Sequence, residues 1–197
     1  MSKLKIAVII GSTRDARFAP IPAQWIFKLA QQREDLSVEL VDVKTFDLPF
    51  FNEKMSNAWA PSEDARAVAW QKKIGEFDGY IVVTAEYNRS ITASLKNAFD
   101  QAYVEWSRKP IAFLGYGGLG AACAIEHAHS ISIELQMVPV KTSVNIGGGE
   151  YLRTVHQREP IAGIEQVLLP SAKKMLDELV WWGSATKTAR ESQASKT

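Results

Sequence analysis

Three short polar segments of the chain carry residue types that bind anions and flat ligands. The first, residues 11–17, reads Gly-Ser-Thr-Arg-Asp-Ala-Arg and follows the aliphatic run of residues 6–10. Hydroxyls, guanidinium groups and free backbone N–H groups at the start of a helix can hold a phosphate. The segment therefore predicts a phosphate site formed by Gly11, Ser12, Thr13, Arg14 and Arg17. The alternative is an ordinary strand-to-helix turn with solvated arginines.

The second polar segment, residues 84–90, follows another aliphatic run. It combines a carboxylate, a phenol, an amide and a hydroxyl, from Glu86, Tyr87, Asn88 and Ser90. This mixture predicts a loop that contacts a ligand. In the alternative interpretation Ser90 or Thr92 caps the next helix, Tyr87 packs and Glu86 is solvated.

The third segment, residues 115–120, matches the spacing G-x-G-x-x-G between a predicted strand and a predicted helix. A dinucleotide fingerprint normally lies in the first such unit and has an acidic residue at the end of the following strand. Here the next strand ends in Lys141, so a Rossmann dehydrogenase is the weaker alternative. The segment, with Tyr116, Gly117 and Gly118, instead predicts close backbone approach to a flat ligand.

Alternating strand-like and helix-like stretches indicate an α/β domain. We predict strands over residues 5–10, 38–43, 80–83, 110–114 and 137–140, and helical stripes over residues 23–30, 62–77, 95–103, 121–135 and 172–182. Right-handed crossovers then favour a five-stranded parallel sheet of order 2-1-3-4-5 with helices on both faces. Ligands bind such sheets at the carboxyl ends of the strands, where the order reverses, so the three segments are expected to meet there.

The length and the charge of the chain limit the number of domains and the kinds of partner that can be expected. The 197 residues carry a net charge of +1 and 46% hydrophobic residues, which is typical of one globular domain. We predict a domain over residues 1–183 and a flexible tail over residues 184–197. A near-neutral body argues against nucleic-acid or membrane binding, and the single Cys123 excludes an intrachain disulfide. We therefore expect a cytoplasmic protein.

Other motifs are absent or weak. The sequence contains no G-x-x-x-x-G-K-[ST] segment, which excludes a P-loop nucleotide hydrolase. His127 and His129 lie two positions apart on a predicted helix and should point to different faces, so no metal site is predicted. Cys123 is expected to be a small buried thiol, and Trp181 and Trp182 to be packing or interface residues.

The combined motifs resemble the NADPH-dependent FMN reductase family of flavodoxin-like proteins over about residues 4–182. The resemblance is carried by Gly11-Ser12-Thr13-Arg14, residues 86–90, Leu95-Lys96-Asn97-Ala98 with Asp100, Tyr116-Gly117-Gly118 and Leu179-Val180-Trp181-Trp182. It implies that FMN is the cofactor, with its phosphate held by Ser12, Arg14 and Arg17. The second loop would follow the ribityl chain and isoalloxazine, largely through backbone groups, and the third would meet the pyrimidine end of the ring.

The resemblance also implies an activity. NADPH or NADH would donate a hydride, and ping-pong exchange through FMN would deliver electrons to free flavin, quinone, azo or metal-oxyanion acceptors. Members commonly form homodimers or homotetramers. An electron carrier or a flavin-sensing interaction protein on the same fold is the alternative. The chain departs from the family pattern at Ala85 and Thr92, where proline is usual, and at Cys123, where an arginine is common.

Overall fold

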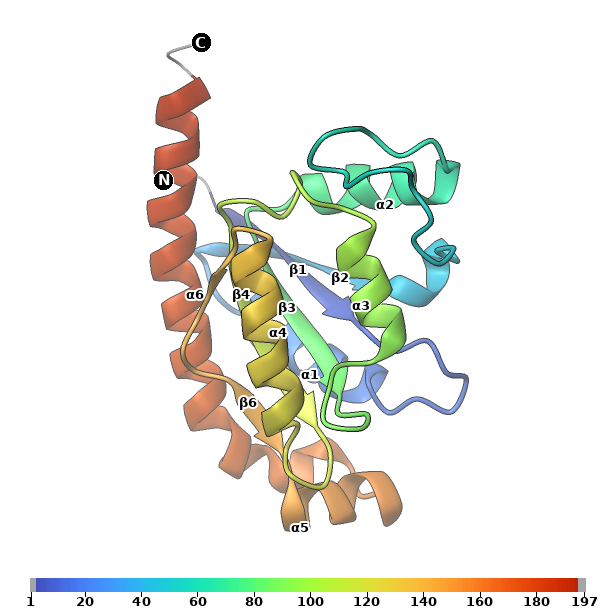
Figure 1. Cartoon of the computed structure of the whole chain (residues 1–197). Helices are drawn as coiled ribbons and strands as arrows, with labels where there is room; N and C mark the ends of the chain where they lie inside the picture. The colour runs from blue at the N-terminus through green and yellow to red at the C-terminus, as the bar shows by residue number, and fades with distance from the viewer. Residues whose placement is uncertain (1–2, 195–197) are drawn as a thin grey trace.

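The computed structural model describes residues 3–194 and contains one parallel sheet (Figure 1). Its strands are β1 (Leu4–Ile10), β2 (Leu36–Asp42), β3 (Gly79–Ala85), β4 (Pro110–Tyr116), β5 (Val138–Pro139) and β6 (Val144–Ile146). The order β2-β1-β3-β4-β5 confirms the predicted topology, and β6 is an additional strand that also pairs with β4. The reversal of strand order lies at β1 and β3, as predicted.

The fifth position of the sheet is divided between two short strands, where the sequence predicted one. β5 pairs with the beginning of β4 at Pro110, whereas β6 pairs with its end at Tyr116. Between them, Thr142 leaves the sheet and donates two hydrogen bonds to the carboxylate of Glu178, from its backbone N (2.8 Å) and its Oγ1 (2.7 Å). This attachment to the last helix separates the two strands. The short strand predicted over residues 137–140 corresponds to β5, and β6 was not predicted.

Helices cover both faces of the sheet, which confirms the predicted layers. The helices α1 (Pro20–Gln31) and α6 (Glu165–Ala194) pack on one face, and α2 (Ala65–Gly75), α3 (Ala93–Asp100) and α4 (Ala122–Glu134) pack on the other (Figure 1). Alternate side chains of β1 point to opposite faces of the sheet, so Ile6 and Val8 pack in one core cluster and Ala7 and Ile9 in the other. Short helical turns are η1 (Val43–Phe46), α5 (Gly148–Tyr151), the π-helix η2 (Leu152–His156) and η3 (Ile161–Ile164).

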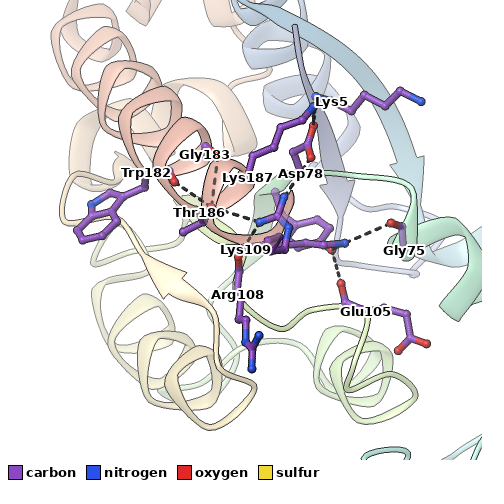
Figure 2. Close-up of polar contacts among 12 residues, drawn as sticks. Lys5, Gly75, Asp78, Glu105, Arg108, Lys109, Trp182, Gly183, Thr186 and Lys187 are labelled. Atoms are coloured by element: carbon purple, nitrogen blue, oxygen red, sulfur yellow. Dashed lines mark hydrogen bonds and ion pairs between the residues drawn. The ribbon is translucent and has the colours of Figure 1, made fainter. Parts of the chain in front are cut away.

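The last helix continues well past the predicted domain boundary. α6 contains Pro170 near its start and remains helical through residue 194, so the predicted flexible tail is wrong for residues 184–194. The half-buried carboxylate of Asp78 holds this segment by an ion pair to Lys187 Nζ (2.9 Å; Figure 2) and another to Arg190 Nη2 (3.1 Å). Residues 195–197 of the predicted tail lie outside the described residues.

The tryptophan pair on α6 is more exposed than its predicted packing role requires. Leu179 is fully buried, whereas Trp181 is 65% exposed and Trp182 is 39% exposed. Their rings make an edge-to-face contact with centroids 4.8 Å apart. The apolar stripe predicted over residues 172–182 therefore ends at Leu179. Within residues 3–194 no helix is long and apolar enough to cross a membrane.

Candidate functional site

The structure brings the three predicted loops together at the carboxyl edge of the sheet. They follow β1, β3 and β4, and direct hydrogen bonds connect them. Gly11 N donates to Val83 O at the end of β3 (3.0 Å), and Glu86 N donates to Tyr116 O at the end of β4 (3.1 Å). The Thr92 hydroxyl reaches back to Gly11 O (2.7 Å). The loops therefore form one connected rim around the point where the strand order reverses.

Close packing fixes the start of the first loop. A Cβ atom on Gly11 would lie 3.1 Å from both Val83 O and Leu95 Cδ2, so a larger residue would displace the loop. Thr92 caps α3 by accepting from Leu95 N (3.2 Å), as one alternative interpretation predicted. Because the same hydroxyl donates to Gly11 O, and Ser94 Oγ donates there as well (2.8 Å), the cap also ties the loops together.

Arg17 has partners within the chain. Its guanidinium makes a bidentate ion pair with Asp42, with Nη1–Oδ1 at 2.7 Å and Nη2–Oδ2 at 2.5 Å, and Nη1 also donates to Ser12 O. The Asp42 carboxylate raises the pKa of Arg17 further above its ordinary value. This arrangement makes Arg17 a brace for the loop backbone. Asp42 was missed by the sequence analysis, although it ends β2 and lies opposite Ile10, the last residue of β1.

Arg14 and Ser12 have no such partners. Arg14 is exposed, and its Cζ lies 5.4 Å from the centroid of the Tyr87 ring. Ser12 is 1% exposed, and its Oγ makes no hydrogen bond of ordinary geometry, although it lies close enough to the Tyr116 phenol to counteract part of the rise in pKa that burial causes there. Thr13 lies nearby on the edge of a cavity of about 480 Å³ that Ser94 also lines. Cationic and unpaired hydroxyl groups in the loop between β1 and α1 suit an anionic ligand.

The second loop is a tight hairpin. Tyr87 and Ser90 exchange backbone hydrogen bonds of 2.8 and 2.9 Å, while Asn88 and Arg89 between them have φ values of +50° and +67°. Positive φ at both central positions is characteristic of a type I′ turn, which side chains other than glycine and asparagine adopt at a cost. The Tyr87 hydroxyl is buried and has no hydrogen-bond partner.

Side chains of this hairpin contact the beginning of α4. The α4 N-cap residue provides no side-chain cap, and Glu86 Oε2 instead accepts from Cys123 N (3.0 Å) and Ala124 N (3.2 Å). The interpretation of Glu86 as a solvated residue is therefore wrong. Ser90 Oγ lies 2.7 Å from His127 Nδ1, and Arg89 Nη1 lies 3.3 Å from Cys123 Sγ. These contacts position residues 86–90 against the α4 helix.

The histidines and the cysteine of α4 have different surroundings. His127 faces the hairpin, whereas His129 lies against the Phe113 ring at 5.4 Å, and burial lowers the pKa of His129. The prediction that the two histidines point to different faces is confirmed. Cys123 is half-buried, so the prediction of a buried thiol is only partly correct. Within residues 3–194 no cluster of His, Cys, Asp and Glu could hold a metal ion.

The third loop rests on a segment that the sequence analysis missed. Gly117 N donates to Ile146 O (3.1 Å), and Gly118 O accepts from Gly148 N (3.1 Å). The Asn145 amide donates to Gly120 O (2.7 Å). The run of three glycines at residues 147–149 is the sequence signal that could have found this support.

Tyr116 and the two glycines differ in exposure. The Tyr116 ring is buried against Phe18 in an edge-to-face contact, with centroids 5.1 Å apart, and burial raises the pKa of its phenol. Gly117 leaves little room, because a Cβ atom there would lie 3.3 Å from the Glu86 Cβ. Gly118 has open space where a side chain would project. A flat ligand can therefore approach the backbone closely at Gly118.

The residues present fit FMN. The buried hydroxyls of Ser12 and Tyr87 have no hydrogen-bond partner within the chain, and the cost of such unpaired groups is relieved by a polar ligand. The exposed Arg14 suits the phosphate, and the open backbone at Gly118 suits a ring. Arg17 and the Glu86 carboxylate hold the loops in place, since internal partners already occupy them.

Comparisons with known proteins agree with this site. A family model described as NADPH-dependent FMN reductase matches residues 4–150. An NAD(P)H-dependent FMN reductase of Nectria sp is 30% identical over 154 residues, which cover 74% of this chain and 77% of the relative. A 2-hydroxy-1,4-benzoquinone reductase of Burkholderia sp is 35% identical over 142 residues, which cover 68% of this chain and 73% of the relative.

A solved structure supports the fold independently. FerB, a flavoenzyme NAD(P)H:(acceptor) oxidoreductase from Paracoccus denitrificans, superposes with a TM-score of 0.67 at 23% identity, covering 93% of this chain and 98% of FerB. At that level of identity the likeness concerns the fold alone. The family match spans all three loops and most of the sheet, and the chain therefore belongs to the NADPH-dependent FMN reductase family.

Proposed function

We propose that this protein is an NAD(P)H-dependent oxidoreductase that binds FMN across its three loops and reduces quinones or free flavin. The observation that carries the proposal is the shared rim, in which the unpaired Ser12 and Tyr87 hydroxyls accompany the exposed Arg14. The family assignment supplies the chemistry for this rim. The Burkholderia relative is named for a benzoquinone and two Pseudomonas relatives are named quinone reductases, which supports quinones as an acceptor class.

Each loop has a distinct task in this proposal. Ser12, Thr13 and Arg14 hold the FMN phosphate, while the Arg17–Asp42 ion pair keeps that loop in position. The backbone of residues 86–90 and the open backbone at Gly118 receive the rest of the cofactor. When bound, FMN supplies two-electron chemistry, accepting a hydride from NAD(P)H and delivering electrons to an acceptor. The protein's contribution is to orient the partners.

An anaerobic absorbance titration tests the proposal directly. FMN-loaded protein is titrated with NADPH and, in a separate sample, with NADH. Rapid loss of the flavin absorbance supports the reductase and identifies the preferred donor. Bound flavin that neither nucleotide reduces would instead indicate an electron carrier or a sensor. If FMN does not bind at all, the three-loop site itself is refuted.

We also propose the cytoplasm as the compartment and a homodimer or homotetramer as the assembly. Family resemblance supports the assembly, and the single cysteine supports a reducing compartment. Sedimentation velocity of the purified protein measures the assembly. A monomer at micromolar concentration would contradict it.

A further inference from the structure

A serine and a histidine connect the side chains of the second loop and α4. Ser90 Oγ lies 2.7 Å from Nδ1 of His127. Ser90 is half-buried and His127 is exposed. Thr92 already caps α3, and the Glu86 carboxylate caps α4. Helix capping therefore does not explain the hydrogen bond between Ser90 and His127.

The Ser90–His127 pair borders the place proposed for the flavin ring. Ser90 and Tyr87 close the hairpin after β3 with backbone hydrogen bonds of 2.8 and 2.9 Å. The third loop lies between β4 and α4, and its Gly118 has open space beside it. Because the Ser90 hydroxyl contacts α4, it lies on the side of the hairpin that faces the third loop. A ligand that rests on both loops therefore comes close to this hydroxyl.

Reduction of a quinone requires a proton donor at such a place. A quinone takes up two electrons and two protons, and each of its C=O groups becomes C–OH. The hydride that originates from NAD(P)H accounts for both electrons and one hydrogen. The second proton has to come from another source, and a positioned acid supplies it faster than bulk water does.

We propose that His127, acting through the Ser90 hydroxyl, delivers this second proton to a quinone oxygen. The inference rests on the proposed function, because the quinone must occupy the rim formed by the three loops. The proton on His127 Nδ1 passes to Ser90 Oγ, while the Ser90 O–H bond breaks and a new O–H bond forms on the quinone. NAD(P)H is oxidised, the quinone is reduced, and no electrons pass through the pair. Water returns a proton to the exposed histidine before the next turnover.

Histidine suits this task because it gains and loses a proton near neutral pH. Other titratable groups contact α4 or lie on neighbouring positions of that helix: Glu86, Arg89, Tyr103, Cys123, Glu126 and His129. Glu86 and Arg89 have opposite charges, and both contact the first turn of α4. Tyr103 meets the far end of the helix, at Glu134 O (3.2 Å). Among the contacts of α4 with other elements, the Ser90 hydroxyl is the one that reaches the His127 ring.

The test compares an acceptor that needs protons with one that does not. FMN-loaded protein is reduced anaerobically with one equivalent of dithionite and mixed in a stopped-flow instrument with tetramethyl-1,4-benzoquinone or with ferricyanide. The substituted quinone has no free ring carbon for the Cys123 thiol to attack, and ferricyanide accepts electrons alone. We expect His127→Gln to slow reoxidation by the quinone about 100-fold, as for the loss of a general acid, and to leave reoxidation by ferricyanide unchanged. His156→Gln, at an exposed histidine in η2, is the matched control.

The dependence on pH and rescue by imidazole separate proton delivery from a structural role. The protonated ring is the donor, so the rate with the quinone should fall as the pH rises in wild type, and this fall should be absent in His127→Gln. Ser90→Ala should slow the quinone reaction as His127→Gln does. Imidazole added to His127→Ala should restore part of the rate, because the position of the missing ring is exposed.

The hydrogen bond can be tested without turnover. NMR of the histidine ring nitrogens in the oxidised, FMN-loaded protein at alkaline pH should show His127 Nδ1 as an acceptor, with the proton on Nε2. Ser90→Ala should change the Nδ1 chemical shift, and His127→Gln identifies the signal. An Nδ1 shift that Ser90→Ala leaves unchanged would refute the pair.

The outcomes distinguish this inference from the proposed function. An unchanged quinone rate in His127→Gln, or equal slowing with both acceptors, would overturn proton delivery by His127. Wild-type protein that is reoxidised by ferricyanide but by no quinone would overturn it as well. Reduction of the bound FMN by NADPH or NADH is a separate step, and it tests the proposed function whatever the Ser90 and His127 variants do.

Discussion

The Ser12 side chain has opposite effects on folding and on binding. Its buried hydroxyl lacks a partner, which costs free energy in the ligand-free protein. We expect Ser12→Ala to leave the free energy of unfolding unchanged or to raise it by about 1 kcal/mol, and to weaken FMN binding about tenfold. Urea denaturation and fluorescence titration measure the two effects, with the exposed Ser37→Ala as control. A destabilised variant with unchanged FMN affinity would refute a ligand-binding role for Ser12.

Arg14 should matter for binding and little for folding. It is exposed and makes no ion pair with a carboxylate, in contrast to Arg17. We expect Arg14→Ala to weaken FMN binding by roughly 1.5–3 kcal/mol, the contribution of a charge-assisted hydrogen bond. The free energy of unfolding should change by less than about 0.5 kcal/mol. Arg66→Ala on α2 is the control, and an unchanged FMN dissociation constant would remove Arg14 from the site.

At the scale of elements, Glu86 joins the second loop to α4. Its carboxylate replaces the missing N-terminal cap of that helix. We expect Glu86→Ala to lower the free energy of unfolding by about 1–2 kcal/mol. Glu86→Gln keeps an acceptor oxygen but loses the charge, so its loss should be about 0.3–1 kcal/mol. Urea denaturation of both variants measures the two decreases in the free energy of unfolding, with Glu126→Ala as control. Equal decreases in Glu86→Ala and Glu86→Gln would contradict a contribution from the charge.

The Asp78 carboxylate anchors the end of α6, where Arg190 Nη1 also donates to Arg108 O (2.6 Å). Asp78 accepts from Lys5 N (3.0 Å) and pairs with Lys187, as Figure 2 shows, and it also pairs with Arg190. Asp78→Ala leaves these cations without their counter-charge, so residues 184–194 should exchange their amide hydrogens faster than in wild type. Asp177→Ala, on an earlier turn of α6, is the control. Unaltered protection of residues 184–194 would show that other contacts hold the helix.

At the scale of the molecule, all three loops open at one edge of a single sheet. We therefore expect the nucleotide and the acceptor to occupy the same place in turn, which gives ping-pong kinetics. Steady-state rates at several fixed acceptor concentrations should give parallel double-reciprocal lines. Intersecting lines would indicate that both substrates bind together, and would contradict a single shared place.

The sequence alone determined the order of the sheet, its layers and the three loops at its edge. These features depend on local patterns: aliphatic runs, helical stripes and the polar residues that end each strand. The handedness of crossovers then leaves few arrangements. For the same reason, the resemblance to FMN reductases was visible from motifs whose spacing lies within single loops.

The tertiary structure decided which residues within those loops remain available to a ligand. Arg14 and Arg17 look equivalent in sequence, yet Asp42, 25 positions away, occupies only Arg17. Glu86 looked solvated until α4 brought Cys123 N to its carboxylate, 37 positions along the chain. Asp78 pairs with Arg190 near the end of α6, 112 positions further along the chain. A charged group pairs with whichever group the folded chain places beside it. Because such partners lie far apart in the sequence, local sequence patterns do not identify them.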